Sequence, residues 1–255
     1  MSASLRRLDV LLSLTRADLN ARYGRGPWQL GKWLLDPFAL VGVYLLLVTF
    51  VLGRPGQAPG LSLACAIVPF QLLMMTIVNS MTAVSTRRSI ILNMSFERIL
   101  IPVSAVLTEA VAFGASLTLV VLLMAVYGVA PTVAIVWLPV VLLATLTLAA
   151  GCAYPATLFG LWFPDMRVVA VSLVRTMFFL APGLVPLAQI EGRAGDLVRL
   201  NPLTGLFESY RAVLLHGHRP AAWQLLYPIG IACLLLLAAL PVYRREQSQF
   251  AKAME

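Results

Sequence analysis

Apolar stretches long enough to cross a lipid bilayer recur along the whole chain. A helix needs about 20 residues to cross about 30 Å of hydrocarbon. Six segments meet this requirement, at residues 34–52, 61–83, 99–128, 132–163, 167–189 and 222–243. Only 12% of the residues are charged, whereas soluble domains carry about 25%. The sequence therefore predicts an all-α integral membrane protein with six transmembrane helices.

The distribution of basic residues between the loops predicts the orientation. With the N-terminus inside, 14 of the 19 Lys and Arg residues lie on or near the cytoplasmic side. Cytoplasmic loops of membrane proteins carry such an excess, so we expect a bacterial inner-membrane location with both termini in the cytoplasm. The net charge is +8, but the basic residues segregate by loop and do not cluster on a soluble face. We therefore expect no nucleic-acid partner.

Residues 3–21 have the pattern of an amphipathic helix. One stripe at helical spacing is apolar, and basic and acidic side chains lie largely elsewhere. Such a helix suits the membrane interface, or alternatively a surface of another protein, and both can hold at once. We expect residues 1–32 to form this cytoplasmic interface helix and its connector. Residues 33–255 then form a single six-helix transmembrane domain, with a cytoplasmic tail at 244–255.

The segment 190–220 differs from the other connections. It is too apolar for a solvated loop and too short and too charged to span a membrane. Asn201 and Pro202 suit the N-cap and first position of a helix, and Gly217 suits its end. We expect a helix of about 15 residues in an outer re-entrant or interfacial hairpin before the last span.

Several kinds of chemistry are not expected in this chain. No phosphate-binding loop of the Gly-x-x-x-x-Gly-Lys-Ser/Thr type occurs, so any ATP hydrolysis is expected in a partner subunit, and no cofactor is expected here. His216 and His218 do not have the spacing of a helical metal site. The cysteines lie inside apolar stretches, where we interpret them as core residues. The sequence has no cluster of Asp, Glu and His residues that could act as a metal site or as acid and base, so we do not expect a membrane enzyme acting on a lipid phosphate.

Glu109 is the one acid well within a predicted span, apart from Asp36 at a span end. An ionisable residue at such a depth is a functional candidate. Two interpretations stay open, namely pairing with a polar group of a neighbouring helix and participation in a proton or ion pathway.

Four motifs follow one another along the chain. The first is Arg16-x-Asp18-Leu19-x-x-Arg22-Tyr23-x-Arg25, followed by Asp36-Pro37 and Val43-Tyr44; the others are Phe96-Glu97-Arg98 with Pro102, Phe163-Pro164-Asp165-Met166, and Asn201-Pro202-Leu203-Thr204 with Tyr210-Arg211, Gly217 and Pro220. In content and order these motifs resemble the permease subunits of type-2 ABC exporters. The likeness is to the branch that exports capsule, O-antigen and teichoic acid polysaccharides.

The resemblance implies a homodimer of six-span subunits around a central pathway, with two cytoplasmic ABC ATPase subunits that bind ATP and Mg. It implies ATP-driven export of a lipid-linked polysaccharide, or alternatively of a drug, a lipid or another small amphiphile. A secondary transporter is less consistent with the sequence, because two inverted repeats with interrupted helices are not apparent.

We predict three groups of site residues. The first group lies between the second and third spans and consists of Arg87, Arg88, Phe96, Glu97 and Arg98. We expect it to transmit motion from the ATPase. Alternatively, its charges only reflect the positive-inside rule. The second lies at the level of the inner-leaflet headgroups: Arg22, Arg25 and Lys32. Guanidinium groups bind phosphate oxygens bidentately, so Arg22 and Arg25 are candidates for a lipid-carrier phosphate. Contact with anionic membrane lipid is the alternative.

The third group consists of aromatic residues that could line a path for sugars: Phe38, Tyr44, Phe70, Phe178, Phe179, Phe207 and Tyr210. Aromatic rings pack against the apolar C–H faces of sugar rings and lose little entropy on ordering. Core packing and anchoring at the membrane interface are the alternative roles. Tyr44 is the strongest candidate, because a hydroxyl at mid-membrane depth needs a polar partner.

Overall fold

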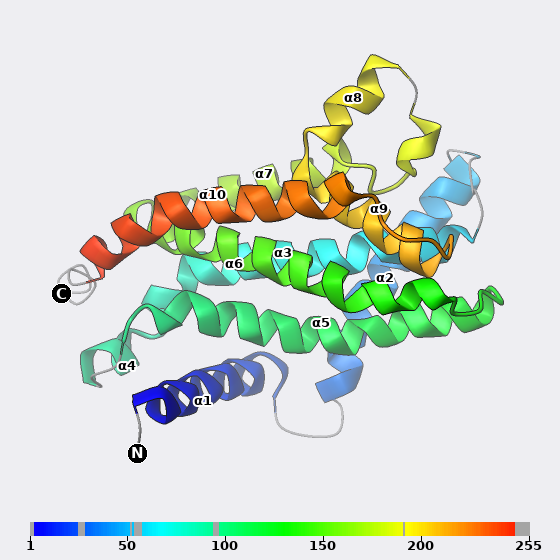
Figure 1. Ribbon diagram of the computed structural model, residues 1–255. Helices are drawn as coiled ribbons and strands as arrows, with labels where there is room; N and C mark the ends of the chain where they lie inside the picture. The colour runs from blue at the N-terminus through cyan, green and yellow to red at the C-terminus, as the bar shows by residue number, and fades with distance from the viewer. Residues whose placement is uncertain are drawn as a thin grey trace.

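The computed structural model describes residues 3–24, 29–51, 53, 58–93, 97–190 and 192–247. Every regular element in these ranges is a helix, and the long helices lie roughly side by side in an elongated bundle (Figure 1). Both termini lie at one end of the bundle, which we call the proximal end; the other is the distal end. The prediction of an all-α membrane protein is confirmed at this level.

Within the described residues, four helices are long and apolar enough to cross a membrane. They are α3 (Pro59–Thr86), α5 (Leu100–Val126), α6 (Leu138–Trp162, preceded by the 3-10 turn Val133–Trp137) and α10 (Ala222–Glu246). Their ends lie within a few residues of the second, third, fourth and sixth predicted spans.

The first and fifth predicted spans have a different form. Helix α2 (Gln29–Leu46) continues as a π-helical turn, Leu47–Val51, and together they cover residues 34–51 of the first predicted span. Helix α7 (Arg167–Leu180) has 14 residues, about 21 Å at 1.5 Å per residue. The expectation of a helix through residue 189 is therefore wrong. Ala181 is extended, with ψ of 164°, as the proline that follows it favours.

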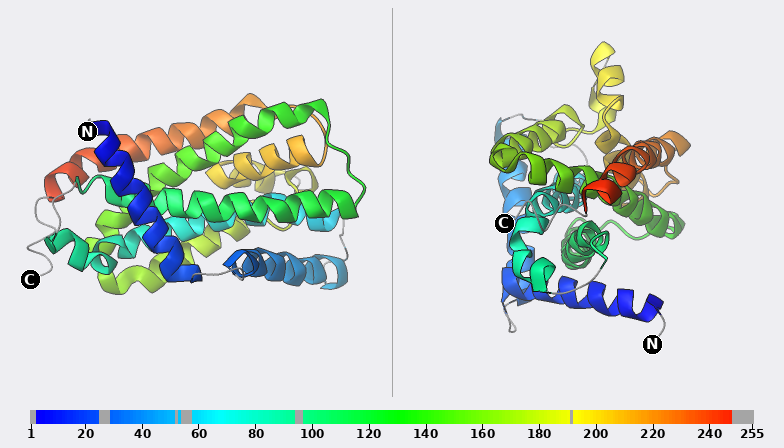
Figure 2. Two further views of the ribbon diagram at one scale, coloured as in Figure 1. Left: turned by 90° about the horizontal axis from the view of Figure 1, so that it is seen from below. Right: turned by 90° about the vertical axis from the view of Figure 1, so that its left-hand side faces the viewer.

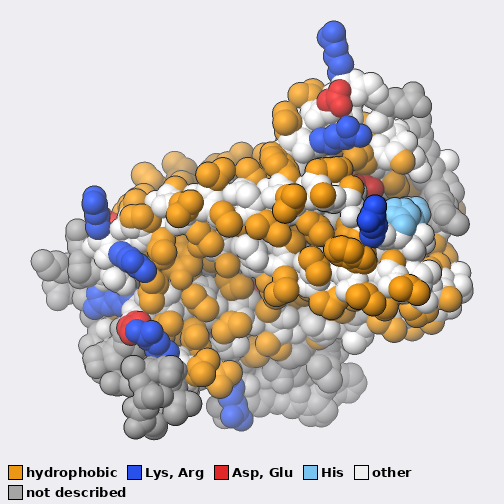
Figure 3. Space-filling view, in the orientation of Figure 1, with side chains coloured by type: hydrophobic (Ala, Val, Ile, Leu, Met, Phe, Trp, Pro, Cys, Tyr) orange, Lys and Arg blue, Asp and Glu red, His pale blue; other side chains and the backbone are white. Residues whose placement is uncertain are grey.

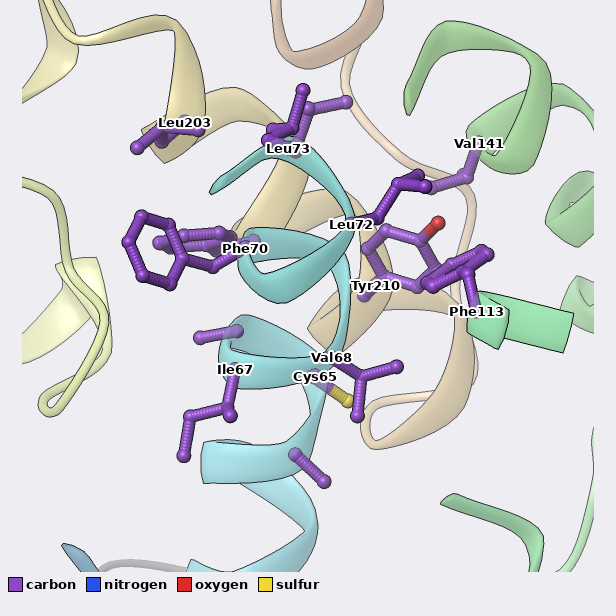
Figure 4. Packing of buried hydrophobic residues seen from close by; sticks show 14 of the residues in the cluster. Cys65, Ile67, Val68, Phe70, Leu72, Leu73, Phe113, Val141, Leu203 and Tyr210 are labelled. Atoms are coloured by element: carbon purple, nitrogen blue, oxygen red, sulfur yellow. The ribbon is translucent and has the colours of Figure 1, made fainter. Parts of the chain in front are cut away.

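Helix α3 is the central element of the bundle. It packs against α2, α5, α6 and α7, and against α9 (Pro202–Leu214). Most of its side chains are apolar or small, so it can be buried on every face, and most of its residues are buried. Figure 4 shows Phe70, Leu72 and Leu73 of α3 pointing in different directions, with Tyr210 and Phe113 on the side of Leu72.

Charged side chains gather at the two ends of the bundle, and a broad hydrophobic surface lies between them on the face shown in Figure 3. The proximal end contains the short helix α4 (Arg88–Asn93) and the end of α10. The distal end contains α9 and the helix α8 (Arg193–Arg199), which projects from the bundle (Figures 1 and 2). An apolar belt between two polar ends is the surface expected of a membrane-spanning chain.

Helix α1 (Ala3–Tyr23) lies obliquely across the bundle near its proximal end (Figure 2). A helix is present at the predicted place, with Leu14 and Thr15 on its buried face, whereas Leu8 and Leu12 are exposed. The reason is that α1 packs on α5 with the side that contains Asp18, whose carboxylate bonds to the neighbouring helices. The exposed leucines remain available to a membrane interface.

Candidate translocation and coupling sites

Five of the seven predicted path aromatics meet in one aromatic cluster, formed by Tyr44, Phe70, Phe178, Phe179 and Phe207. They come from α2, α3, α7 and α9, with Phe178 at the centre. The Phe178 ring centroid lies 4.7 Å from that of Phe70 and 5.9 Å from that of Phe207. It lies 5.9 Å from Tyr44 and 5.5 Å from Phe179. These distances are typical of favourable aromatic pairs.

The aromatic cluster has a buried side and an accessible edge. Phe70, Phe178 and Phe207 are buried, whereas Phe179 is 57% exposed and Tyr44 is half-buried. The Tyr44 and Phe179 rings meet edge to face at 6.3 Å. In the single chain the accessible edge is therefore the part of this cluster that another molecule can reach.

The other two predicted path aromatics lie outside the aromatic cluster. Phe38 is on α2 and is 40% exposed. Tyr210 is 1% exposed, and its hydroxyl lies 3.0 Å from the Thr145 hydroxyl of α6. Tyr210 is thus a core residue of the chain with its polar group satisfied by a neighbouring helix.

Arg87, the C-cap residue of α3, and Arg88, the first residue of α4, have opposite environments. Arg88 is exposed, whereas Arg87 is 5% exposed. The Arg87 guanidinium forms an ion pair with Asp18 of α1 and donates to the Ser104 hydroxyl of α5 at 3.1 Å. Arg87 therefore connects three helices through its charge.

The turn before α5 contains Glu97 and Arg98; Phe96 lies outside the described residues. Glu97 forms an ion pair with Arg7 of α1 at 2.7 Å, with both side chains about half exposed. Such an exposed pair contributes little stability. The Arg98 guanidinium donates to the Gln247 carbonyl oxygen at the end of α10. Arg87, Glu97 and Arg98 thus contact α1, α5 and α10.

A polar cavity of about 260 Å³ lies between α1, α3 and α5, and its lining includes Asp18, Arg87 and Glu109. The Asn79 amide of α3 donates to Glu109 at 2.6 Å. Pairing with a polar group of a neighbouring helix, one of the two interpretations of Glu109, is therefore what the structure shows.

Two of the three predicted lipid-phosphate residues lie in described helices. Arg25 lies outside the described residues. The backbone of Arg22 is helical in α1 and that of Lys32 is helical in α2. The two thus lie on either side of the connector that joins the interface helix to the first long helix.

At the distal end Arg211 is fully buried, with 0% exposure. Its guanidinium donates to Glu208 at 2.7 Å, to the Pro182 carbonyl at 2.6 Å and to the Gly183 carbonyl at 3.1 Å. It also donates to the Ser62 hydroxyl at 3.1 Å. These contacts join α9 to the start of α3 and to the turn after α7, and we call them the Arg211 network.

Helix α9 begins as the sequence predicts. The Asn201 side chain accepts a hydrogen bond from the Leu203 amide at 3.0 Å, and Pro202 follows at the first helical position. The Asn201 amide group also donates to the Met177 carbonyl of α7 at 2.7 Å. One N-cap residue therefore both starts α9 and attaches it to α7.

The His216 and His218 rings stack in the loop after α9, with centroids 5.7 Å apart. Partial burial lowers the pKa of His216, and the neighbouring His218 lowers it further. Among the described residues, no group of three or more His, Cys, Asp or Glu side chains could hold a metal ion.

Sequence reasoning missed the Arg211 network and the ion pair of Arg87 with Asp18. The spacing of Glu208 and Arg211, three residues apart in an otherwise apolar helix, was a local signal for a paired charge. No local signal pairs Asp18 with Arg87, since 69 residues separate them.

Known proteins resemble the chain over nearly its whole length, although no family model matches it. It is 29% identical to the O-antigen export system permease protein RfbA of Myxococcus xanthus, over 96% of this chain and 95% of the relative. It is 23% identical to a protein of the same name from Klebsiella pneumoniae, with the same coverage. The chain thus resembles the permease subunit of a type-2 ABC polysaccharide exporter, as its four motifs predict.

Proposed function

We propose that the chain is the permease subunit of an ATP-driven ABC exporter that moves a polysaccharide across the bacterial inner membrane. The similarity over 96% of the chain to proteins named O-antigen export system permease carries this proposal. The apolar helices of the bundle supply the membrane-spanning part. The chain itself carries no phosphate-binding loop, so the proposal includes a separate cytoplasmic ATPase.

Cells that make the polysaccharide provide the test. Without this chain, the polysaccharide should accumulate inside and be absent from the cell surface. Restoring the chain should restore surface polysaccharide only when the partner ATPase is catalytically intact. Normal surface polysaccharide in cells that lack the chain would contradict the proposal.

The proposal includes six spans and cytoplasmic termini. The α2 helix with its π-helical turn forms the first span, and α7 with the residues after it forms the fifth. Segment 190–220, with α8 and α9, is then the outer re-entrant part. The positive-inside distribution of charge supports this orientation, with the proximal end in the cytoplasm.

Thiol labelling of intact cells checks the orientation. In a chain whose native cysteines are replaced, Arg88→Cys should resist a membrane-impermeant thiol reagent, because it lies at the proximal end. Arg219→Cys, in the exposed loop before α10, should react. Rapid labelling of Arg88→Cys in unbroken cells is incompatible with this topology.

We place the translocation path at the accessible edge of the aromatic cluster, where a second copy of the chain completes it. Tyr44 and Phe179 form this edge, and Phe38 lies on the same helix as Tyr44. The buried members, Phe70, Phe178 and Phe207, support the edge from behind. A rigid aromatic surface suits a chain of sugars that must slide without being held at one position.

Replacing Tyr44 with alanine should lower polysaccharide export about two- to tenfold, the factor that corresponds to about 0.5–1.5 kcal/mol of aromatic contact. ATP hydrolysis by the assembled complex should fall less. The control is Phe159→Ala, which removes a 38% exposed aromatic ring on α6 that pairs with Phe163. Equal export by the two variants, at equal amounts of protein, would remove Tyr44 from the path.

The lipid-linked form of the substrate rests on Arg22, Arg25 and Lys32. Arg22 and Lys32 lie on either side of the connector between α1 and α2, and Arg25 lies between them in the sequence. This place suits the phosphate of a lipid carrier at the inner leaflet. Arg22 and Arg25 supply bidentate donors, and Lys32 supplies a point charge.

A further inference from the structure

The turn that leads into α5 is attached to the proximal ends of two other long helices. Arg98 is held twice by α10, because its carbonyl oxygen accepts a hydrogen bond from the Tyr243 hydroxyl at 2.9 Å and its guanidinium donates to the Gln247 carbonyl. The next carbonyl, that of Ile99, accepts from the Tyr154 hydroxyl of α6 at 3.3 Å.

The two tyrosines form a rigid support. Tyr243 is 0% exposed and Tyr154 is 8% exposed. Their rings meet edge to face, with centroids 5.2 Å apart and an interplanar angle of 87°, a favourable geometry that fixes both rings. They belong to a separate hydrophobic cluster that also contains Val84 and Ile101. Each hydroxyl is therefore aimed at the turn by a packed ring.

The attachment to α10 has an electrostatic component as well. Tyr243 and Gln247 lie one helical turn apart, and Gln247 is the C-cap residue of α10. The carboxyl end of a helix carries a partial negative charge, which a guanidinium stabilises. The Arg98 side chain thus binds the end of α10 while its backbone binds the preceding turn.

We infer that Tyr243 and Tyr154 are positioning residues for energy coupling, because they hold the turn at Glu97–Ile99 on α10 and α6. This inference rests on the proposed function and on the role predicted from the sequence for residues 87–98, which is to receive motion from the ATPase. A segment attached to two long helices moves those helices with it. A segment released from them moves alone, and ATP is then hydrolysed without export.

The sharpest variant is Tyr243→Phe, which keeps the ring against Tyr154 and removes only the hydroxyl. Helix α10 offers a matched control, Tyr227→Phe, since the Tyr227 hydroxyl donates to the Leu200 carbonyl at 2.6 Å near the distal end. Both variants lose one hydroxyl-to-carbonyl bond from the same helix. Tyr154→Phe is a second test variant with a longer hydrogen bond.

In vesicles that contain the chain and its ATPase, Tyr243→Phe should lower the polysaccharide exported per ATP hydrolysed about fivefold, the factor of a hydrogen bond of ordinary net strength. Tyr154→Phe should lower it less, and Tyr227→Phe should leave it near the original ratio. Equal ratios for Tyr243→Phe and Tyr227→Phe would overturn the inference.

A second measurement does not depend on transport. A nitroxide label at Arg88→Cys, in a chain without native cysteines, reports the mobility of the segment that the turn at Glu97–Ile99 terminates. Its mobility should rise in Tyr243→Phe and stay unchanged in Tyr227→Phe. Equal mobility in both would overturn the inference, whether or not the vesicles export. If the wild-type complex shows no ATP-driven export, the proposed function itself is contradicted.

Discussion

Replacing Arg211 with alanine is expected to destabilise the folded chain by about 3–5 kcal/mol, the usual effect of removing one partner of a buried ion pair. Glu208 would lose its cation at 14% side-chain exposure. The Pro182 and Gly183 carbonyls and the Ser62 hydroxyl would lose their donor. Because these groups lie on three segments, α9 should detach from α3 and from the turn after α7.

Thermal unfolding in detergent, followed by the fraction of monodisperse protein, measures this effect. Arg199→Ala is the control, since Arg199 lies in the same distal segment and pairs with Asp196 at 3.8 Å with both side chains largely exposed. Loss of such a pair should cost about 0–1 kcal/mol. If the two variants unfold at the same temperature, the Arg211 network does not hold the distal end together.

Replacing Gly160 with alanine should have the second-largest effect, because it forces α3 and α6 apart. A Cβ atom at Gly160 would lie 2.0 Å from the Met81 carbonyl oxygen and 2.5 Å from the Met81 Cα. Both are backbone atoms, so no side chain can turn away to make room. Overpacking of this kind typically costs about 1–3 kcal/mol, and small residues commonly permit such close approach between membrane helices.

Gly114→Ala is the matched control for this substitution. Gly114 lies within α5, and a Cβ atom there would meet nothing within 4 Å. Alanine is the better helix former, by about 0.5–1 kcal/mol, so this variant should unfold at the same or a higher temperature. If Gly160→Ala unfolds at the same temperature as Gly114→Ala, α3 and α6 are not in the contact described.

The sequence predicts the long helices well because hydrophobicity and length together define them. The ends of α5, and of α6 taken together with the 3-10 turn Val133–Trp137 before it, lie within two residues of the predicted spans 99–128 and 132–163. The end of α7 was missed for a physical reason. Hydrophobic residues continue beyond Leu180, but the backbone leaves the helix at Ala181, before Pro182.

The candidate sites were only partly predictable. The aromatic side chains could be chosen by type, but no local pattern shows that Tyr44 of α2, Phe70 of α3 and Phe178 of α7 meet. Arg87 and Arg211 illustrate the same limit. Charge counting assigned them to opposite sides of the membrane, yet both are buried and paired through tertiary contacts that only the fold brings together.

ATP-driven transport into sealed vesicles tests the central claim most directly. Vesicles that contain this chain and its ATPase, with the ATPase facing the external solution, receive radiolabelled lipid-linked polysaccharide and ATP from outside. The account predicts that the polysaccharide becomes protected inside the vesicles only when ATP, an active ATPase and this chain are all present. Equal protection without ATP, or with an ATPase that cannot hydrolyse ATP, would contradict the account.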